Sequence, residues 1–130
     1  MWFDYAYGKE KIIHMFNNEL SLSGVEFDKL IYHDVSRLTI FFNSRKLPSV
    51  MPKKWIETTF NSLSISLTFT EVLALKIDGG RMGFECTPIV DLVNGSTRFI
   101  IENEGFEFLC ISNFMFIDNI VPYLDDRWVG

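Results

Sequence analysis

The residues that could act as nucleophiles, metal ligands or general bases are few and widely separated in this chain. Its two cysteines are Cys86 and Cys110, and its two histidines are His14 and His33. No spacing of cysteines and histidines typical of a zinc site occurs. Each cysteine lies between apolar or β-forming residues, an environment that raises a thiol pKa and leaves the thiol unreactive. We expect two buried, reduced thiols and no bound metal or other cofactor. The sequence does not decide against the alternative, a disulfide between the two cysteines on neighbouring strands.

Carboxylates are more numerous, and several stand close together in the sequence. General acid–base catalysis needs two carboxylates that converge on a cleft with separated pKa values, and residues two apart on a strand merely share one side of it. His33 beside Asp34 is interpreted as an exposed polar pair near a hairpin tip. We therefore expect no enzyme activity, and we interpret these pairs as solvated surface charges: Glu26 with Asp28, Glu102 with Glu104, and Asp125 with Asp126.

The charge balance argues against a direct nucleic-acid partner. The formal net charge is −5, whereas binding to phosphate depends on lysine and arginine displacing counterions. The glycines at 79, 80 and 83 match neither a phosphate-binding loop nor a dinucleotide-binding motif, so this segment is interpreted as a turn. Acidity would favour a basic protein partner, because opposite charges accelerate encounter. The only clustered cations are too few to follow a phosphate backbone: Arg45, Lys46, Lys53 and Lys54.

Length and composition indicate one folded domain over residues 1–130. A hydrophobic fraction of 48% with 15% aromatic residues is far from that of disordered chains. Thirteen phenylalanines supply ample material for a core. The chain start lacks the features of a secretory signal, and no apolar run is long enough to span a membrane. We expect a cytoplasmic protein.

The elements that would position these residues are mostly strands. Residues 9–18 carry apolar side chains at helical spacing and predict one short helix, which Asn17 and Asn18 would end. Residues 25–34 and 38–43 are rich in β-branched and aromatic residues and predict a hairpin. A loop with two prolines follows. Aromatic residues before the helix are expected to fix it to the rest of the fold: Trp2, Phe3, Tyr5 and Tyr7.

Residues 61–70 give the clearest pattern in the chain. Leucine, isoleucine and phenylalanine alternate strictly with serine and threonine. Because side chains on a strand alternate between faces, this predicts one buried face and one solvated, hydroxyl-bearing face. Residues 72–77 are expected to return as the next strand, followed by a turn at 78–80.

Further short strands are predicted over residues 84–86, 89–93, 97–102 and 106–112. Turns are expected at Asn94–Gly95 and Glu104–Gly105. Residues 114–123 fit either a last strand or a short helix. The predicted fold is mainly β, α+β at most, with antiparallel strands in a curled sheet, a sandwich or a partly open barrel.

The loop over residues 48–55 contains the only tryptophan in the middle of the chain. Trp55 follows Lys53 and Lys54, and prolines stiffen the loop. Tryptophan is enriched in interface hot spots, so this loop could be a recognition anchor. It could equally plug one end of the sheet, which is the interpretation we favour.

This loop, the Phe60-Asn61 pair that follows it and the opening Trp2 resemble the immunity protein 50 family. The resemblance extends over most of the chain, and its most specific part is the Lys-Trp…Phe-Asn stretch, with Met51 where the family pattern has a second proline. It implies a bacterial polymorphic-toxin system in which the protein binds and neutralises a cognate toxin domain in the cytoplasm, without catalytic residues or cofactors. The residues that carry the match are expected to be structural: Trp2, Pro52, Lys54, Trp55, Phe60 and Asn61.

The leading hypothesis is therefore an immunity protein that contacts its toxin directly. The acidity suggests a basic toxin, and a toxin that attacks nucleic acid would fit. A small-ligand-binding β domain with an aromatic-lined cavity is the alternative. The sequence does not decide whether the chain forms a homodimer through a free sheet edge or through the hydroxyl-rich face. Candidate toxin contacts are acidic residues around one turn and near the end of the chain: Glu102, Glu104, Glu107, Asp125 and Asp126.

Overall fold

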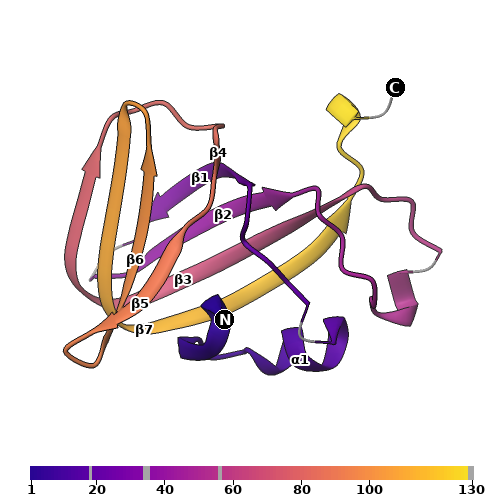
Figure 1. Cartoon of the computed structure of the whole chain (residues 1–130), viewed down its shortest axis with the longest axis horizontal. Coiled ribbons are helices and arrows are strands. Elements are labelled where there is room, and N and C mark those ends of the chain that lie inside the picture. Colours follow the sequence, from indigo (N-terminus) through magenta and orange to yellow (C-terminus); the bar gives the residue numbers. More distant parts are fainter. Residues whose placement is uncertain (18, 34–35, 56, 129–130) are drawn as a thin grey trace.

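The structure is a computed structural model that describes residues 1–17, 19–33, 36–55 and 57–128. In this part of the chain seven strands form one sheet in the order β4-β1-β2-β3-β7-β6-β5, and every neighbouring pair is antiparallel (Figure 1). The mainly β prediction is confirmed. The strands are β1 (Val25–Tyr32), β2 (Leu38–Ser44), β3 (Ser62–Asp78), β4 (Glu85–Cys86), β5 (Ile89–Val93), β6 (Ser96–Asn103) and β7 (Phe106–Tyr123).

The sheet curls into a partly open barrel rather than folding into a sandwich. The long strands β3 and β7 cross the whole molecule, and β6 and β5 turn back towards β4 (Figure 1). At the open seam the Asn103 side-chain amide donates a hydrogen bond of 3.2 Å to the carbonyl oxygen of Glu85. One curled sheet therefore encloses the core from several sides, and no second sheet is needed.

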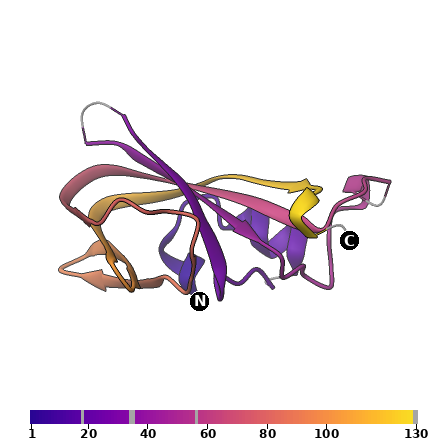
Figure 2. The ribbon, with the colours of Figure 1, turned by 90° about the horizontal axis from the view of Figure 1, so that it is seen from above.

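The first two helices of the chain lie on the inner side of this curl (Figure 2). The 3-10 helix η1 (Trp2–Tyr5) leads into α1 (Glu10–Phe16), which buries Ile12 and Phe16 completely. Asn17 ends α1 in the left-handed conformation at φ 49°, a role that asparagine tolerates well. The predicted helix is thus confirmed, while Asn18 lies outside the described residues. Two short 3-10 helices complete the chain, η2 (Lys53–Trp55) and η3 (Asp126–Trp128).

The core is built largely from phenylalanine. Phe27 on β1 is fully buried and contacts the rings of Phe42, Phe84, Phe106 and Phe108 at centroid distances of 5.5–6.1 Å. Its partners come from β2, from the segment before β4 and from β7. The rings therefore contact one another inside the curl and connect β1 and β2 with the segment before β4 and with β7. This arrangement uses the phenylalanines for packing and offers no observation in favour of an aromatic-lined ligand cavity.

Two predicted strand breaks are wrong, because the chain continues through both positions within a single strand. Residues 62–78 form one strand, where we expected a return after residue 70. Glu71 has φ 50°, and the register of β3 against β7 shifts between Val72 and Ala74. A bulge absorbs one extra residue and bends the strand without ending it. Likewise, residues 106–123 form one strand, so the ambiguous last segment is not a helix.

The prediction for the alternating strand is confirmed for its inner face and wrong for its outer face. Leu63, Ile65, Leu67 and Phe69 are fully buried, as predicted. The hydroxyl-bearing residues are also largely buried, and Thr68 is only 3% exposed. Their larger cross-strand neighbours explain this, since Phe41 lies opposite Ser66 and Phe116 lies opposite Thr68.

Other predictions about the chain are settled by single observations. The hairpin of β1 and β2 is confirmed by their antiparallel register, and its tip at residues 34 and 35 lies outside the described residues. Both cysteines are free. Burial raises the pKa of Cys86 to about 11 and that of Cys110 to about 12. No helix among the described residues has the length and apolarity to cross a membrane.

Candidate functional site

The structure brings three of the predicted acidic residues together at one end of the sheet. Glu102 lies opposite Glu107 in the β6–β7 pair, and Glu104 stands in the turn between these strands. Two further acidic residues come from other strands: Asp78 lies opposite Glu107 at the end of β3, and Glu85 starts β4 beside the seam. All five are exposed. We call this set the acidic rim: Asp78, Glu85, Glu102, Glu104 and Glu107.

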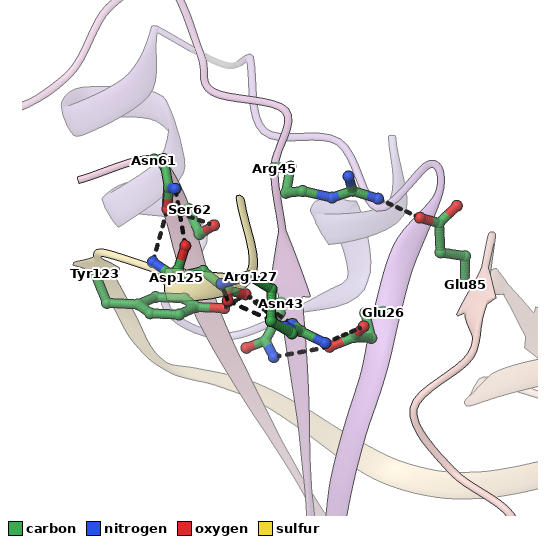
Figure 3. Close-up of polar contacts among 9 residues, drawn as sticks. All are labelled: Glu26, Asn43, Arg45, Asn61, Ser62, Glu85, Tyr123, Asp125 and Arg127. Atoms are coloured by element: carbon green, nitrogen blue, oxygen red, sulfur yellow. Dashed lines mark hydrogen bonds and ion pairs between the residues drawn. The ribbon is translucent and has the colours of Figure 1, made fainter. Parts of the chain in front are cut away.

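Two of the rim carboxylates have cationic partners within the chain. The Lys76 ammonium lies 3.1 Å from the Glu107 carboxylate, and this hydrogen bond raises the lysine pKa. Arg45 pairs with Glu85 (Figure 3). Both pairs are about half exposed, and such surface pairs contribute little to stability. The carboxylates of Asp78, Glu102 and Glu104 have no ion-pair partner among the described residues.

The other predicted acidic residues, Asp125 and Asp126, lie elsewhere, after the end of β7. Asp126 is exposed, whereas Asp125 is only 7% exposed. The Asp125 carboxylate accepts hydrogen bonds from the Arg127 guanidinium, the shortest at 2.7 Å (Figure 3). Arg127 also donates to Glu26 on β1 at 2.8 and 3.0 Å. Asp125 is therefore engaged within the chain, where it holds the C-terminal segment against β1.

Asn61 completes this arrangement, which we call the C-terminal clamp: Asn61, Asp125, Arg127 and Glu26. The Asn61 side-chain oxygen accepts the backbone N–H of Asp125 at 2.8 Å, and its amide nitrogen donates to the Asp125 carbonyl at 3.1 Å. A single side chain thus satisfies both backbone groups of one residue 64 positions away. This gives Asn61 a structural role in positioning the last segment.

We expect Asn61→Ala to loosen this segment. Losing two hydrogen bonds, with the partner groups left partly buried, should lower the free energy of unfolding by about 1–3 kcal/mol. Backbone amides of residues 124–127 should exchange faster with deuterium. The exposed Asn119→Ala is the matched control, since no described side chain bonds to Asn119. Equal stability and unchanged exchange in Asn61→Ala would rule out the clamp.

The clamp should also make stability depend on pH. The hydrogen bond from Arg127 holds the pKa of Glu26 below its ordinary value, which is roughly 4.3 in unfolded chains. Because the pKa is depressed in the folded state, the stabilisation is fully present above the unfolded value and is lost as pH falls through the folded one. In acid titrations followed by circular dichroism, we expect Arg127→Ala to lose less stability than the unaltered protein as the pH falls below the unfolded pKa of Glu26. An unchanged pH profile would contradict the pairing.

The residues that carried the family resemblance pack at the opposite side of the core. Trp55 is only 6% exposed and contacts the rings of Phe16 and Phe60 at 5.4 and 5.9 Å. Its backbone N–H donates to the carbonyl oxygen of Pro52. The Trp2 indole donates to the carbonyl oxygen of Leu20 at 2.9 Å. The loop therefore plugs the sheet, and the recognition-anchor alternative is wrong for Trp55; Lys54 remains exposed.

Within the described ranges, the side chain that bonds to His33 is a threonine hydroxyl rather than a carboxylate or thiol. His33 Nε2 lies 3.0 Å from the Thr39 hydroxyl, which in turn lies 2.9 Å from the Thr68 hydroxyl. Asp34 lies outside the described residues, so its pairing with His33 is not settled. No group of three histidine, cysteine or acidic side chains in the described ranges is placed to hold a metal ion.

Sequence reasoning missed two members of the rim. The sequence predicts a turn at residues 78–80 and a short strand over residues 84–86, and neither pattern points to a shared surface. The register of β3 against β7, and of β4 against β1, brings them to the rim. The only local signal was that each acidic residue ends or begins a strand.

Together, the fold and the rim define a small antiparallel β protein built on one curled sheet with an acidic exposed end. Within this class the chain belongs to the immunity protein 50 family, whose model matches residues 8–123. The match includes most of the structural motif and all seven strands. Comparison with curated proteins and with solved structures finds no match. The predicted resemblance is thereby confirmed.

Proposed function

We propose that this protein binds the toxin domain of a cognate bacterial polymorphic toxin by direct contact and so neutralises it. Membership of the immunity protein 50 family supports the immunity role. The observation that carries the choice of surface is the acidic rim, where the exposed Glu102 and Glu104 have no ion-pair partner among the described residues and Asp78 interacts with Lys76 through its charge alone. Carboxylates without internal partners are available to pair with cations of another molecule.

The charge of the chain supports a basic toxin. A net charge of −5 attracts a positively charged domain over a distance of about one Debye length, roughly 8–10 Å in physiological salt. Complementary charge raises the association rate and disfavours partners of the wrong sign. A toxin that cleaves or modifies nucleic acid carries a basic surface to bind phosphate. We therefore expect the rim to contact, or to lie beside, such a surface.

The proposed mechanism is steric and electrostatic. The rim carboxylates occupy the positions that substrate phosphates would take on the toxin, and the rest of the sheet end excludes the substrate. No covalent step and no cofactor is required. Of the residues proposed from the sequence, Glu102, Glu104, Glu107 and the exposed Asp126 would meet the toxin. Asp125 would act through its bond to Arg127, by positioning Asp126. The encounter would take place in the cytoplasm of the producing cell.

Co-purification tests this function. The toxin domain encoded immediately upstream is expressed with this protein, which carries the only affinity tag. We expect the two chains to elute together, and we expect cells that die from the toxin alone to grow when this protein is present. A catalytically inactive toxin domain, still folded, allows the complex to be isolated without toxicity. Failure of both binding and rescue with every neighbouring toxin domain would overturn the proposal.

A further inference from the structure

The later half of β3 is an edge of the sheet, although its earlier half lies between two strands. β2 pairs with β3 only over residues 63–69, whereas β7 continues beside β3 as far as Asp78. Figure 1 shows this half running along one side of the molecule with β7 on one flank only. We call residues 73–78 the β3 edge. Within the described ranges no strand pairs with its other flank.

Glu71 marks the point where β3 leaves β2. Its backbone is in the left-handed conformation at φ 50°, and the register against β7 shifts between Val72 and Ala74. A bulge of this kind bends a strand and increases its twist. The later half of β3 therefore diverges from β2 while it stays paired with β7. Five of the six residues of the β3 edge are exposed, so its free side faces solvent.

The alternation of hydrogen bonds across the sheet identifies the unused backbone groups. The turn Asn94–Gly95 has positive φ at both residues and closes the β5–β6 hairpin, so Val93 and Ser96 bond to each other. Successive residues of a strand direct their N–H and C=O groups to opposite sides, so Thr97 bonds instead to its partner on β7, Ser112. Every second residue of β7, counted back from Ser112, therefore bonds to β6, and the residues between them bond to β3.

The residues of β7 that bond to β3 lie opposite three residues of the β3 edge: Ala74, Lys76 and Asp78. Leu75 and Ile77 therefore direct their N–H and C=O groups to the free side. Val72 follows the same alternation, since it lies opposite Ser112 and its N–H points to the free side, where it donates to the carbonyl oxygen of Ser36. No described residue bonds to Leu75 or Ile77 on that side. Four backbone groups are thus available to another strand.

Apolar side chains accompany these groups. Leu73 is 62% exposed, more than any other large apolar side chain in the described ranges except Met1, and Ile77 is 41% exposed. Unpaired strand edges with exposed apolar side chains are templates for pairing with another chain, and proteins commonly block them with charge. The one lysine of the β3 edge, Lys76, is already paired with Glu107. The β3 edge is therefore suited to accept a strand.

A second copy of this chain fits the β3 edge poorly. The antiparallel register that uses both Leu75 and Ile77 of each copy is centred on Lys76, and it places two ammonium groups directly opposite each other. Like charges in that position destabilise strand pairing, and two chains of net charge −5 also repel one another. A basic partner avoids this repulsion, can place an uncharged residue opposite Lys76, and meets the acidic rim where the β3 edge ends at Asp78.

We propose that the β3 edge takes up an extended segment of the toxin domain as an additional strand. The segment carries an apolar side chain next to Ile77 and a cationic side chain beside Asp78. In strand addition, main-chain hydrogen bonds contribute affinity and the alternate side chains contribute specificity. This inference rests on the proposed function, because the partner is the toxin, and it adds a backbone contact to the charge contact of the acidic rim.

Residue-resolved hydrogen exchange by NMR tests the β3 edge, with the catalytically inactive toxin domain encoded immediately upstream as the probe. In the free protein, the amides of Leu75 and Ile77 should exchange fast, whereas the amide of Lys76 is protected by its bond to β7. In the complex, exchange at Leu75 and Ile77 should slow on the order of 100-fold. Saturable binding with unchanged exchange at both residues would overturn this inference and leave the proposed function standing, whereas absence of binding would overturn both.

Two substitutions at one position give a second test. I77P removes an N–H that the sheet does not use, so the β3–β7 ladder keeps its hydrogen bonds. I77T, the matched control, keeps the N–H. We expect I77P to bind the toxin domain on the order of 10-fold more weakly and I77T to retain most of the affinity. Circular dichroism checks folding, and the exchange measurement decides if I77P unfolds. A folded I77P that binds as tightly as I77T would contradict strand addition.

Discussion

Replacing Phe27 with alanine is expected to lower the free energy of unfolding by about 3–5 kcal/mol, the range for a large buried aromatic side chain. Phe27 has no exposed surface and contacts four other rings. Those rings come from β2, from the segment before β4 and from β7, so the cavity would form inside the curl, between strands that are not neighbours in the sheet. A domain of this size has only about 5–15 kcal/mol of stability in total. A substantial part of the chain should then unfold at modest denaturant concentration.

Urea denaturation followed by tryptophan fluorescence measures this loss. Tyr32→Ala is the matched control, because Tyr32 lies on the same strand and is 56% exposed. We expect it to change stability by less than about 0.5 kcal/mol. A similar loss in both variants would show that the rings around Phe27 do not hold the curl together.

Reversing the charge of the acidic rim is expected to weaken toxin binding on the order of 100-fold, because like charges would then face the basic toxin surface. The variant changes Glu102, Glu104 and Glu107 to lysine. All three side chains are exposed, so the fold should persist. Slower association should account for most of the loss, and the difference from the unaltered protein should shrink at high salt.

A second triple variant separates local contact from net charge. Glu10, Glu57 and Glu71 are exposed and lie outside the rim, and changing them to lysine alters the total charge by the same amount. We expect this control to retain most of the affinity in surface plasmon resonance and to protect cells from the toxin. Equal weakening in both triple variants would mean that charge acts from the whole surface, and that the rim is not the contact.

The sequence predicts the strands well where the pattern is local. Alternation over residues 61–70 identifies both the strand and its buried face, because a side chain's face depends only on odd or even position. The same alternation does not reveal that Thr68 is buried. Its burial depends on Phe116, 48 positions away in the chain and brought opposite by strand register. Long-range register has no local signal.

Bulges are the second limit on prediction. The sequence predicts a break after residue 70, where Glu71 interrupts an alternating run, but the chain continues through Glu71 in a left-handed conformation at φ 50°. Glutamate has no special preference for that conformation. The continuation is stabilised by pairing with β7 over the whole length of β3, so tertiary structure decides between a turn and a bulge.

The candidate site was predictable in part. The sequence groups Glu102, Glu104 and Glu107 around one turn, and the structure keeps them together and exposed. Asp125 illustrates the limit, since an aspartate near a chain end is usually solvated, yet here Asn61 and Arg127 bury it. Asn61 lies 64 positions away, so it is recognisable as a partner of Asp125 only once β3 and β7 are paired.

The central claim is that this protein neutralises a toxin by binding it directly. Titration of the purified, catalytically inactive toxin domain into this protein, by isothermal calorimetry in physiological salt, tests that claim most directly. We predict saturable binding with one toxin domain per chain, weakened by the rim reversal and preserved in the control triple variant. No heat of binding with a toxin domain against which this protein protects cells, under conditions where both are folded, would contradict direct neutralisation.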